Sequence, residues 1–352
     1  LDPLAEYLKK KNYRVIGISL PGGNSYKDQT YLKYLNISYD FYSSKIKNLF
    51  LGNNLEVNFW IKLFKKVNPK VILCIQPSPT MCVAAKICNI LITDVQHGFI
   101  SDTIYYNLKN PYGAKGLPNL VLCWDKVSSN YLKKILPNTS SYVLGNPWIM
   151  KVYEKNHNKF ISREEKKLEL IISKEPIIII TLQWKKNFTK EIISIPKNVI
   201  KSLQILVSKG WKCFIRFHPA HINEFTINSL HQKWNEKTNL ILDNNFIYDV
   251  TNFSLPYLLK YANVHITSYS AAIIEAKNMG VPSYFWSNNK KVVDKLIQNY
   301  LKSPSVKKLP FKINESVRVL NLHKRKKKIN LYSKFIKDPK VKYDILINQI
   351  LI

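Results

Sequence analysis

The chain has 352 residues, 46% of them hydrophobic, and carries 54 lysines and arginines against 23 aspartates and glutamates, which gives a formal net charge of +31. This length exceeds what one hydrophobic core usually supports and fits two domains of ordinary size. Because no apolar run approaches the length of a transmembrane helix and the N-terminus lacks a signal-peptide pattern, we expect a cytoplasmic protein, either soluble or peripheral at the inner face of the cytoplasmic membrane.

The first part of the chain predicts alternating helices and strands. A helix over Asp2–Lys11 precedes a strand over Tyr13–Ile18. The following Pro21–Ser25 predicts a plain turn, because it lacks the Gly-x-Gly-x-x-Gly spacing of a dinucleotide-binding loop. Further predicted strands and helices include Val71–Ile75, Pro79–Cys88, Ile90–Val95, Leu120–Trp124 with a helix through Lys134, and Tyr142–Pro147. Repeated alternation of this kind favours parallel sheets with helices on both faces.

A histidine turn after Ile90–Val95 supplies the first candidate catalytic residue. Gly98 permits a sharp turn next to His97, and an imidazole in this place can remove a proton from an attacking hydroxyl. Asp94 and Asp102 lie on either side of the turn and are competing candidates for the base. A buried turn histidine that bonds only to backbone fits the same residues equally well, so the choice stays open.

A polar and charged stretch divides the chain. We expect an N-terminal domain over residues 1–150, a linker over 151–175, a C-terminal domain over 176–330, and a C-terminal helix over 331–352 that packs back on the N-terminal domain. The C-terminal domain begins with the apolar strand Ile177–Ile180.

A strand that ends in a histidine follows. Gly210–Phe217 predicts a turn and a strand, and Pro219 biases His218 toward an extended backbone. His218 and the nearby Arg216 are therefore placed at the carboxyl end of a strand, where ligands of open α/β sheets bind. An imidazole, with an ordinary pKa near 6.5, can donate to a phosphate oxygen. A His-Pro dipeptide by itself is more often an ordinary loop than a site.

Paired hydroxyls follow the next strand, Ala262–Thr267. A helix is predicted to begin at its N-cap Ser270 and to stop at Gly280. The unpaired N–H groups and partial positive charge of a helix start stabilise phosphate, and Ser268 adds a hydroxyl. Glu275, on the same helix, can accept hydrogen bonds from ribose hydroxyls. A structural serine cap and a solvated glutamate are the alternative.

The order of these motifs resembles a known family. The segment Asp249–Trp286, with the helix Leu255–Leu259, a strand, Ser-x-Ser, Glu-Ala and Gly280-Val281-Pro282, resembles the donor domain of GT-B glycosyltransferases, and the likeness extends over most of the chain. More narrowly, it is similar to bacterial capsule and lipopolysaccharide transferases with His-Pro and paired Ser/Thr motifs, including sialyltransferases and other transferases of CMP-activated keto-sugars. Gln96-His97-Gly98 matches capsule transferases, whereas the acidic-acidic-Gly motif that carries the base in sialyltransferases is absent.

The resemblance implies an α/β protein of the GT-B fold, with two Rossmann-like domains that face a central cleft. It implies an inverting, metal-independent glycosyltransferase without a cofactor, which moves a nonulosonic acid or Kdo-type sugar from a CMP-activated donor to a hydroxyl of a bacterial surface glycan or glycolipid. A GT-B N-terminal domain usually opens with a strand, so we expect a trimmed first strand or a domain cut from a longer protein. The implied base is His97, Asp94 or Asp102, and the implied donor-nucleotide residues are Gln183, Arg216, His218, Pro219, Ser268, Ser270 and Glu275.

Two other functions remain open. A CDP-glycerol or CDP-ribitol phosphotransferase shares the expected cleft and many motifs, and a non-catalytic polyanion-binding protein fits the charge. The excess of lysine, densest at His323–Lys328, favours nucleotide sugars, acidic glycans or an anionic membrane surface as partners. Nucleic acid is disfavoured, because the sequence contains no zinc finger, helix-turn-helix or aromatic-basic module. The five cysteines lie mostly in apolar segments and predict reduced core residues, and neither cysteine nor histidine spacing predicts a metal site.

Overall fold

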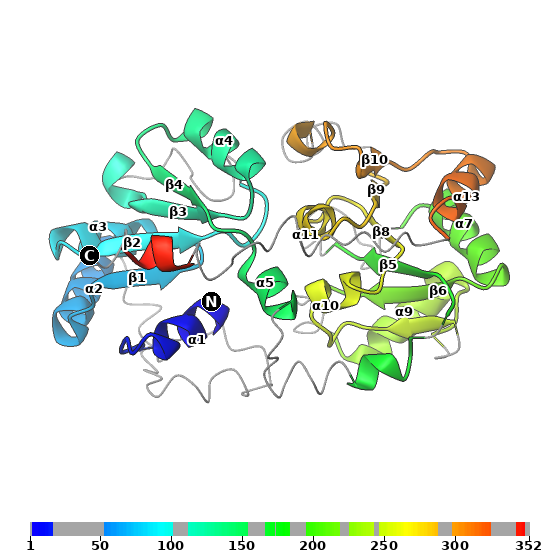
Figure 1. Ribbon diagram of the computed structural model, residues 1–352, viewed down its shortest axis with the longest axis horizontal. Coiled ribbons are helices and arrows are strands. Elements are labelled where there is room, and N and C mark those ends of the chain that lie inside the picture. The colour runs from blue at the N-terminus through cyan, green and yellow to red at the C-terminus, as the bar shows by residue number, and fades with distance from the viewer. Residues whose placement is uncertain are drawn as a thin grey trace. The chain divides into compact units, whose positions relative to one another are not determined.

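The computed structural model of the chain describes residues 2–16, 53–100, 112–153, 166–172, 174–183, 195–218, 225–242, 246–287, 298–324 and 343–348. These residues belong to two compact units, Leu1–Pro147 with Asp338–Ile352, and Trp148–Lys337 (Figure 1). Each unit contains a parallel sheet with helices, so the α/β class expected from the sequence is confirmed. None of the helices in the described ranges is both long and apolar enough to cross a membrane.

Unit 1 contains a four-stranded sheet in the order β1-β2-β3-β4, with every neighbouring pair parallel. Its strands are β1 (Val71–Cys74), β2 (Leu91–Val95), β3 (Leu120–Cys123) and β4 (Ser140–Val143). Its helical segments are α1 (Asp2–Lys10), α2 (Asn53–Val67), α3 (Pro79–Ile87), η3 (Gly113–Gly116) and α4 (Lys126–Ile135), and α5 (Pro147–Tyr153) begins where the unit ends.

Two elements expected in unit 1 differ from the structure. Residues 13–16 are described and form no strand, while the rest of the segment expected to be a strand lies outside the described residues. The strand expected over Tyr142–Pro147 is β4, which ends earlier, at Val143. Gly145 adopts a φ of 97°, a left-handed conformation that a continuing strand does not use, so the backbone turns there.

The C-terminal segment packs on the first helix of the same unit. Residues 343–348 are helical. The hydroxyl of Tyr7 donates to Asp344 Oδ1 at 2.7 Å, and Lys11 Nζ lies 2.8 Å from the same carboxylate. The rings of Tyr7 and Tyr343 contact each other in a tilted arrangement, at a centroid distance of 4.8 Å and an interplanar angle of 39°. These contacts join the two ends of the chain within unit 1.

Unit 2 contains a six-stranded sheet in the order β10-β9-β8-β5-β6-β7, again parallel throughout. The strands are β5 (Ile177–Thr181), β6 (Lys212–Arg216), β7 (Ile247–Asp249), β8 (Val264–Thr267), β9 (Ser283–Phe285) and β10 (Val306–Lys308). The helices are α7 (Lys197–Ser208), α9 (Ile227–Thr238), α10 (Leu255–Leu259), α11 (Ala272–Asn278) and α13 (Ile313–Asn321), with a short η5 (Gln298–Tyr300).

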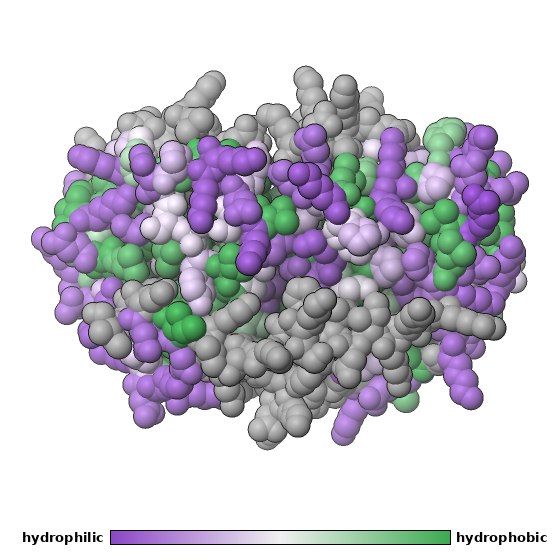
Figure 2. Space-filling model, turned by 45° about the horizontal axis from the view of Figure 1, so that its top comes forward, coloured by the Kyte–Doolittle hydropathy of each residue, from purple (hydrophilic) through white to green (hydrophobic). Residues whose placement is uncertain are grey.

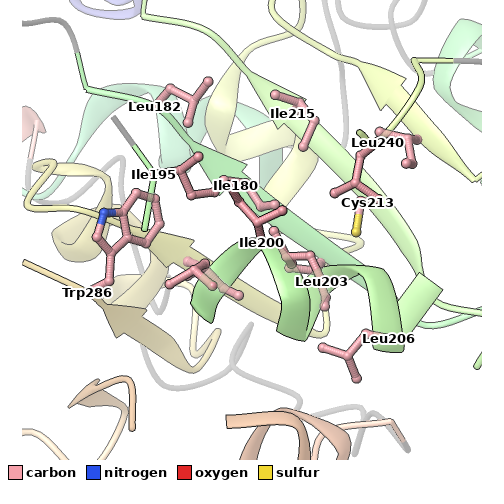
Figure 3. Packing of buried hydrophobic residues seen from close by; sticks show 14 of the residues in the cluster. Ile180, Leu182, Ile195, Ile200, Leu203, Leu206, Cys213, Ile215, Leu240 and Trp286 are labelled. Atoms are coloured by element: carbon pink, nitrogen blue, oxygen red, sulfur yellow. The ribbon is translucent and has the colours of Figure 1, made fainter. Parts of the chain in front are cut away.

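The central strand β5 is apolar on both faces because helices cover both. Ile178 and Ile180 belong to the core on the side of α7, α9 and α13, part of which is drawn in Figure 3. Ile177 and Ile179 belong to the core on the side of α10 and α11. A strand buried on both faces reads as a continuous apolar run, which is why Ile177–Ile180 was recognisable from the sequence.

Local sequence signals set several helix ends. The side chain of Ser78 accepts the N–H of Met81 at 3.1 Å at the start of α3. The side chain of Asp125 accepts the N–H of Ser128 at 2.8 Å at the start of α4. α7 ends where Gly210 adopts a φ of 83°. Such caps satisfy N–H groups that a helix leaves unpaired, and glycine permits the left-handed turn that stops it.

Candidate functional site

The strand order of unit 2 reverses at β5. From β5 the chain moves outward to β6 and β7, and it then returns to the other side of β5 as β8, β9 and β10. The last residues of neighbouring strands are paired, with Thr181 opposite Arg216 on one side and Thr267 on the other, and Thr267 opposite Phe285. Because the strands are parallel, their carboxyl ends share one edge. Ligands of open parallel sheets bind outside this edge, where the order reverses.

Three of the residues expected to bind the donor follow these strand ends directly. Gln183 comes two residues after β5, His218 two residues after β6, and Ser268 one residue after β8. Strand pairing therefore brings together residues that lie far apart in the sequence. Arg216 is the last residue of β6 and its Nε donates to the carbonyl of Phe253 at 3.4 Å. Pro219 lies outside the described residues.

The side-chain oxygen of Gln183 is the notable polar atom at this edge. Its Oε1 is buried and has no hydrogen-bond partner among the described residues. A buried acceptor of this kind costs about 1–3 kcal/mol, and such atoms are uncommon in native proteins. The position of Gln183, directly after the central strand at the order reversal, makes a ligand donor group a physical explanation for this unpaired oxygen.

The hydroxyls after β8 stand where the sequence placed them, but the helix starts later than expected. α11 begins at Ala272 with Ala271 as its N-cap, so the prediction of Ser270 as the N-cap was wrong. The Ser270 carbonyl accepts the N–H of Ile273 at 3.1 Å, and its hydroxyl accepts the N–H of Ala272 at 3.2 Å, so this serine forms a tight turn that leads into the helix.

The other residues of this segment frame the same turn. Ser268 is 8% exposed, and Glu275 lies half-buried in the first turn of α11. Gly280, with a φ of 67°, follows the end of the helix as expected. Ser268 and Glu275 therefore stand before and inside the helix that begins at the carboxyl edge.

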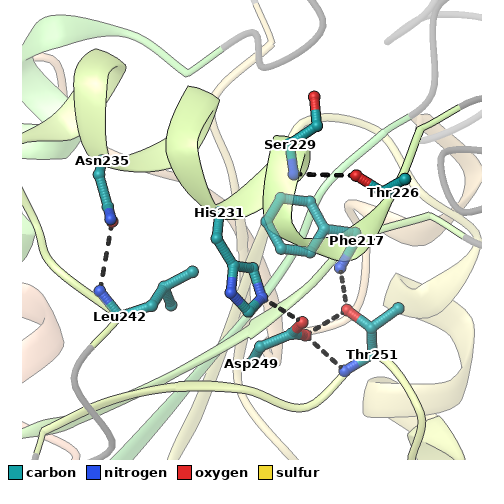
Figure 4. A network of polar contacts seen from close by, with 8 residues as sticks. All are labelled: Phe217, Thr226, Ser229, His231, Asn235, Leu242, Asp249 and Thr251. Carbon is teal, nitrogen blue, oxygen red and sulfur yellow. Dashed lines mark hydrogen bonds and ion pairs between the residues drawn. The ribbon is translucent and has the colours of Figure 1, made fainter.

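The turn that carries His218 rests on a polar network, drawn in Figure 4. The backbone N–H of Phe217 donates to the hydroxyl oxygen of Thr251 at 3.0 Å, and that hydroxyl donates to Asp249 Oδ1. The other carboxylate oxygen of Asp249 lies 2.7 Å from Nε2 of His231 on α9. The ring of His231 also stacks on Phe217, at a centroid distance of 6.2 Å. One carboxylate thus ties the ends of β6 and β7 to α9, directly before His218.

Sequence reasoning did not identify His231, Asp249 or Thr251. A local signal was present, because Asp249 Oδ1 also accepts the N–H of Thr251 at 2.9 Å, an aspartate turn that Asp-x-Thr after a strand allows. The contacts to Phe217 and His231 depend on the strand order and could not be read from neighbouring residues.

A second polar group lies inside the sheet, beneath this edge. His265 in β8 is fully buried, and burial lowers its pKa to about 3. Its Nε2 is 2.9 Å from the hydroxyl of Thr181 in β5, and its Nδ1 is 2.6 Å from the hydroxyl of Ser283 in β9. The hydroxyl of Thr267 donates to the carbonyl of Thr181 at 2.8 Å. A neutral imidazole therefore connects β5, β8 and β9, of which β5 and β8 lead to Gln183 and Ser268.

The candidate bases of unit 1 differ in their surroundings. His97 follows β2 and is exposed, while its neighbours Gln96 and Gly98 are buried. Desolvation by the surrounding protein lowers the pKa of its imidazole, although the exposed position lets solvent limit this effect. Asp94, inside β2, is 3% exposed and its Oδ1 accepts the N–H of Gln76 at 3.0 Å. Asp102 lies outside the described residues.

Gln96 holds the His97 turn in place. Its amide donates to the carbonyl of Gly98 at 2.7 Å and to the hydroxyl of Ser128 at 3.0 Å, and its oxygen accepts the N–H of Trp124 at 2.7 Å. These contacts explain why a polar side chain is buried at this position. The imidazole of His97 is thereby presented on a turn with a fixed backbone.

In the described part of the chain, no group of three or more histidine, cysteine, aspartate or glutamate residues is arranged to hold a metal ion. Burial instead raises the pKa of Cys82, Cys123 and Cys213 to about 12, which keeps these thiols protonated.

Comparison with known proteins reveals relatives by structure only. No protein-family model matches the chain, and no curated protein matches it. The UDP-GlcNAc 2-epimerase from Neisseria meningitidis bound to UDP-GlcNAc is similar, with a TM-score of 0.64 and 15% identity over 99% of this chain and 95% of that one.

Two further solved structures are similar to this chain in fold. The UDP-GlcNAc 2-epimerase from Methanocaldococcus jannaschii gives a TM-score of 0.62 at 13% identity over 99% and 95% of the two chains. A glycosyltransferase from Rickettsia africae gives 0.52 at 16% identity over 99% and 89%. At these identities the likeness establishes the fold alone, a GT-B-like fold with two parallel-sheet α/β units.

Proposed function

We propose that this protein is a glycosyltransferase that uses a nucleotide-activated sugar and binds the nucleotide at the carboxyl edge of the unit 2 sheet. The convergence of Gln183, His218 and Ser268 at the point where the strand order reverses carries the proposal. Three different hydrogen-bonding groups lie at this edge: an imidazole, a hydroxyl, and a buried acceptor that has no partner among the described residues. A nucleotide has matching donors and acceptors on its base, ribose and phosphate.

Each residue has a role in this proposal. The imidazole of His218 donates to a phosphate oxygen and stabilises the charge that builds up as the nucleotide leaves. The hydroxyl of Ser268 donates to the same phosphate, while Glu275 accepts from the ribose hydroxyls. Gln183 Oε1 accepts an N–H or O–H of the bound nucleotide. Arg216 and Ser270 shape the backbone around these groups, since both already bond to neighbouring main chain.

For the acceptor we propose a glycan or glycolipid hydroxyl, deprotonated by His97. Its lowered pKa favours the neutral imidazole that a general base needs near neutral pH. Asp94 is the weaker candidate, because its carboxylate is buried and one oxygen already accepts a backbone N–H. Asp102 remains a candidate from the sequence. A cytoplasmic location, where nucleotide sugars are made, belongs to the same proposal.

The nucleotide is proposed to be a pyrimidine nucleotide. The motif resemblance favours CMP linked to a nonulosonic acid or Kdo-type sugar, whereas the structural relatives include an epimerase bound to UDP-GlcNAc. Thermal-shift measurements with CMP, CDP, UDP and GDP separate these possibilities, because selective binding raises the melting temperature by mass action. A shift with CMP supports the keto-sugar donor, a shift with UDP replaces it by a UDP-sugar, and a shift with GDP alone contradicts the proposal.

His218→Ala is the matching variant. The loss of a hydrogen bond to a charged phosphate should weaken nucleotide affinity by about tenfold or more. Ser208→Ala, an exposed serine at the end of α7, serves as the control and should bind like the wild type. Equal affinity in all three proteins would remove His218 from the site.

Sugar epimerisation is the second candidate, favoured by the full-length match to 2-epimerases at TM-scores of 0.64 and 0.62. Incubation with UDP-GlcNAc in the absence of any acceptor distinguishes the two activities. An epimerase changes the configuration at carbon 2 of the sugar under these conditions, while a transferase leaves the sugar nucleotide intact until a glycan acceptor is added.

A further inference from the structure

The exposed charge of unit 2 is concentrated on one part of its surface. We name this part the basic surface: the exposed side chains of α7, of its C-terminal Lys209, and of the segment Val306–Lys324, which contains β10 and α13. α7 and α13 pack against each other. Among these described residues, eight exposed cations accompany one exposed acid, Glu315, and the cations are Lys197, Lys201, Lys209, Lys307, Lys308, Lys312, Arg318 and Lys324.

The neighbouring helix on the same side of the sheet is different. α9 contributes Leu230 and Trp234 to the core that α7 and α13 also cover. Its exposed charged residues are Glu236 and Lys237, whose opposite charges cancel. Exposed cations are therefore distributed unevenly over the described part of unit 2. Within the basic surface, Lys312 Nζ lies 3.7 Å from Glu315, an ion pair between exposed side chains that is weak.

Two large apolar side chains stand among these cations. Phe311 is 75% exposed and lies two residues before α13, and Leu322 is 74% exposed and directly follows the helix. The backbone around Phe311 is held in place, because Asn198 Nδ2 donates to the Phe311 carbonyl at 2.8 Å and the Ser316 hydroxyl donates to the Pro310 carbonyl. The ring is thus held away from the core by contacts that fix its main chain.

This combination matches the chemistry of an anionic lipid surface. Lysines attract acidic headgroups, and an exposed aromatic ring with a leucine can enter the boundary between headgroups and acyl chains. A soluble polyanion would use the cations but would gain nothing from Phe311 and Leu322. Figure 2 shows that described hydrophobic residues lie in groups among hydrophilic ones on the face it draws. In the basic surface, eight exposed cations accompany two exposed large apolar side chains, so charge would provide most of the attraction.

We infer that the basic surface docks unit 2 on an anionic membrane, with Phe311 and Leu322 entering the headgroup layer. The N–H of Leu309 donates to the carbonyl of Phe285 at 2.8 Å, so the segment that leads to Phe311 starts at the carboxyl edge of the sheet. This inference does not depend on the proposed reaction.

Co-sedimentation of the full chain with phosphatidylcholine vesicles, with and without phosphatidylglycerol, tests it. The protein should sediment only with the phosphatidylglycerol vesicles and should be released at high salt. Each lysine at an anionic surface adds about fivefold to partitioning, so the double variant Lys197→Gln/Lys201→Gln should bind about 25-fold more weakly. The matched control is Lys166→Gln/Lys167→Gln, a pair of exposed lysines of unit 2 outside the basic surface, which should stay within about twofold of the wild type.

Phe311→Ser distinguishes lipid from other polyanions. It should lower vesicle binding by about tenfold, while binding of a soluble polyanion such as polyphosphate stays unchanged. The inference is overturned if the two lysine pairs weaken vesicle binding equally, or if Phe311→Ser leaves it unchanged. Circular dichroism of each variant confirms that the fold is retained, and Leu322→Ser provides a second test of insertion should Phe311→Ser fail to fold.

Discussion

The buried histidine in β8 makes the stability of unit 2 depend on pH. His265 is fully buried with both ring nitrogens bonded to hydroxyls, and its pKa falls from 6.5 to about 3 on folding. Between these two values the unfolded chain binds a proton that the folded chain excludes. This contribution to stability is therefore complete above about pH 6.5 and is lost as the pH falls toward 3. The loss is about 1.4 kcal/mol per pH unit, or about 2 kcal/mol between pH 7 and pH 5.

Urea unfolding at both pH values, compared between the wild type and His265→Gln, measures this contribution. The variant should be less stable at pH 7, because the hydroxyls of Thr181 and Ser283 lose a buried partner at about 1–3 kcal/mol. Its free energy of unfolding should fall by about 2 kcal/mol less than that of the wild type when the pH is lowered. Other titrating groups contribute to both proteins and cancel in the difference.

His323→Gln serves as the control, because this half-buried histidine bonds to Tyr284 near the protein surface. It should keep most of the wild-type pH dependence. Equal pH dependence of the unfolding free energy in the wild type and His265→Gln would refute the assignment of this pH dependence to His265. If His265→Gln does not fold, the ring signals of His265 in the wild-type NMR spectrum should remain those of neutral imidazole down to about pH 4, and a midpoint near 6 would refute it.

Three further predictions concern a hydrogen bond, a glycine conformation and the buried thiols. Thr251→Val removes the acceptor of the Phe217 N–H and should cost about 1–3 kcal/mol in urea unfolding, with nucleotide affinity reduced in parallel; Thr251→Ser should restore both. Gly210→Ala should cost about 1–2 kcal/mol through its φ of 83° alone, because a Cβ there meets no atom within 4 Å, and Gly210→Asn should cost less. A thiol reagent at neutral pH should label the buried thiols only after unfolding, and rapid labelling of the native protein would contradict their raised pKa values; they are Cys82, Cys123 and Cys213.

The sequence predicted those parts of the fold whose signal is local. The strand Ile177–Thr181 was visible as an apolar run, and the end of α11 at Gly280 was visible because glycine readily adopts a left-handed conformation. The short strand β10 was not predicted, since Val306–Lys308 contains two exposed lysines and only its pairing with β9 makes it a strand. β4 ends at Val143 instead of the expected Pro147, because the exact end of a strand depends on its pairing with the neighbouring strand.

The residues of the candidate site also differ in whether a local sequence signal predicts them. His218 and Ser268 could be proposed from the sequence because each lies within two residues of the end of an apolar strand. The partners of His265 lie 84 and 18 residues away in sequence, so its role within the sheet could not be seen until the strand order was known. The same holds for His231, which reaches Asp249 only because α9 packs beside β6 and β7.

The hydrogen bonds of His265 also fix the register of the strands that lead to the candidate site. Ile179 pairs with His265 and Thr181 with Thr267. Two hydrogen bonds form only in this register, one between the Thr181 hydroxyl and His265 and one from the Thr267 hydroxyl to the Thr181 carbonyl. A slip of one residue would turn His265 toward the opposite face of the sheet, against apolar side chains, and leave its ring nitrogens unpaired. An apolar pair would stabilise the sheet without distinguishing these registers. The buried imidazole therefore fixes the register of β8 against β5. The same register sets the relative positions of Gln183 and Ser268, on which the proposed nucleotide binding depends.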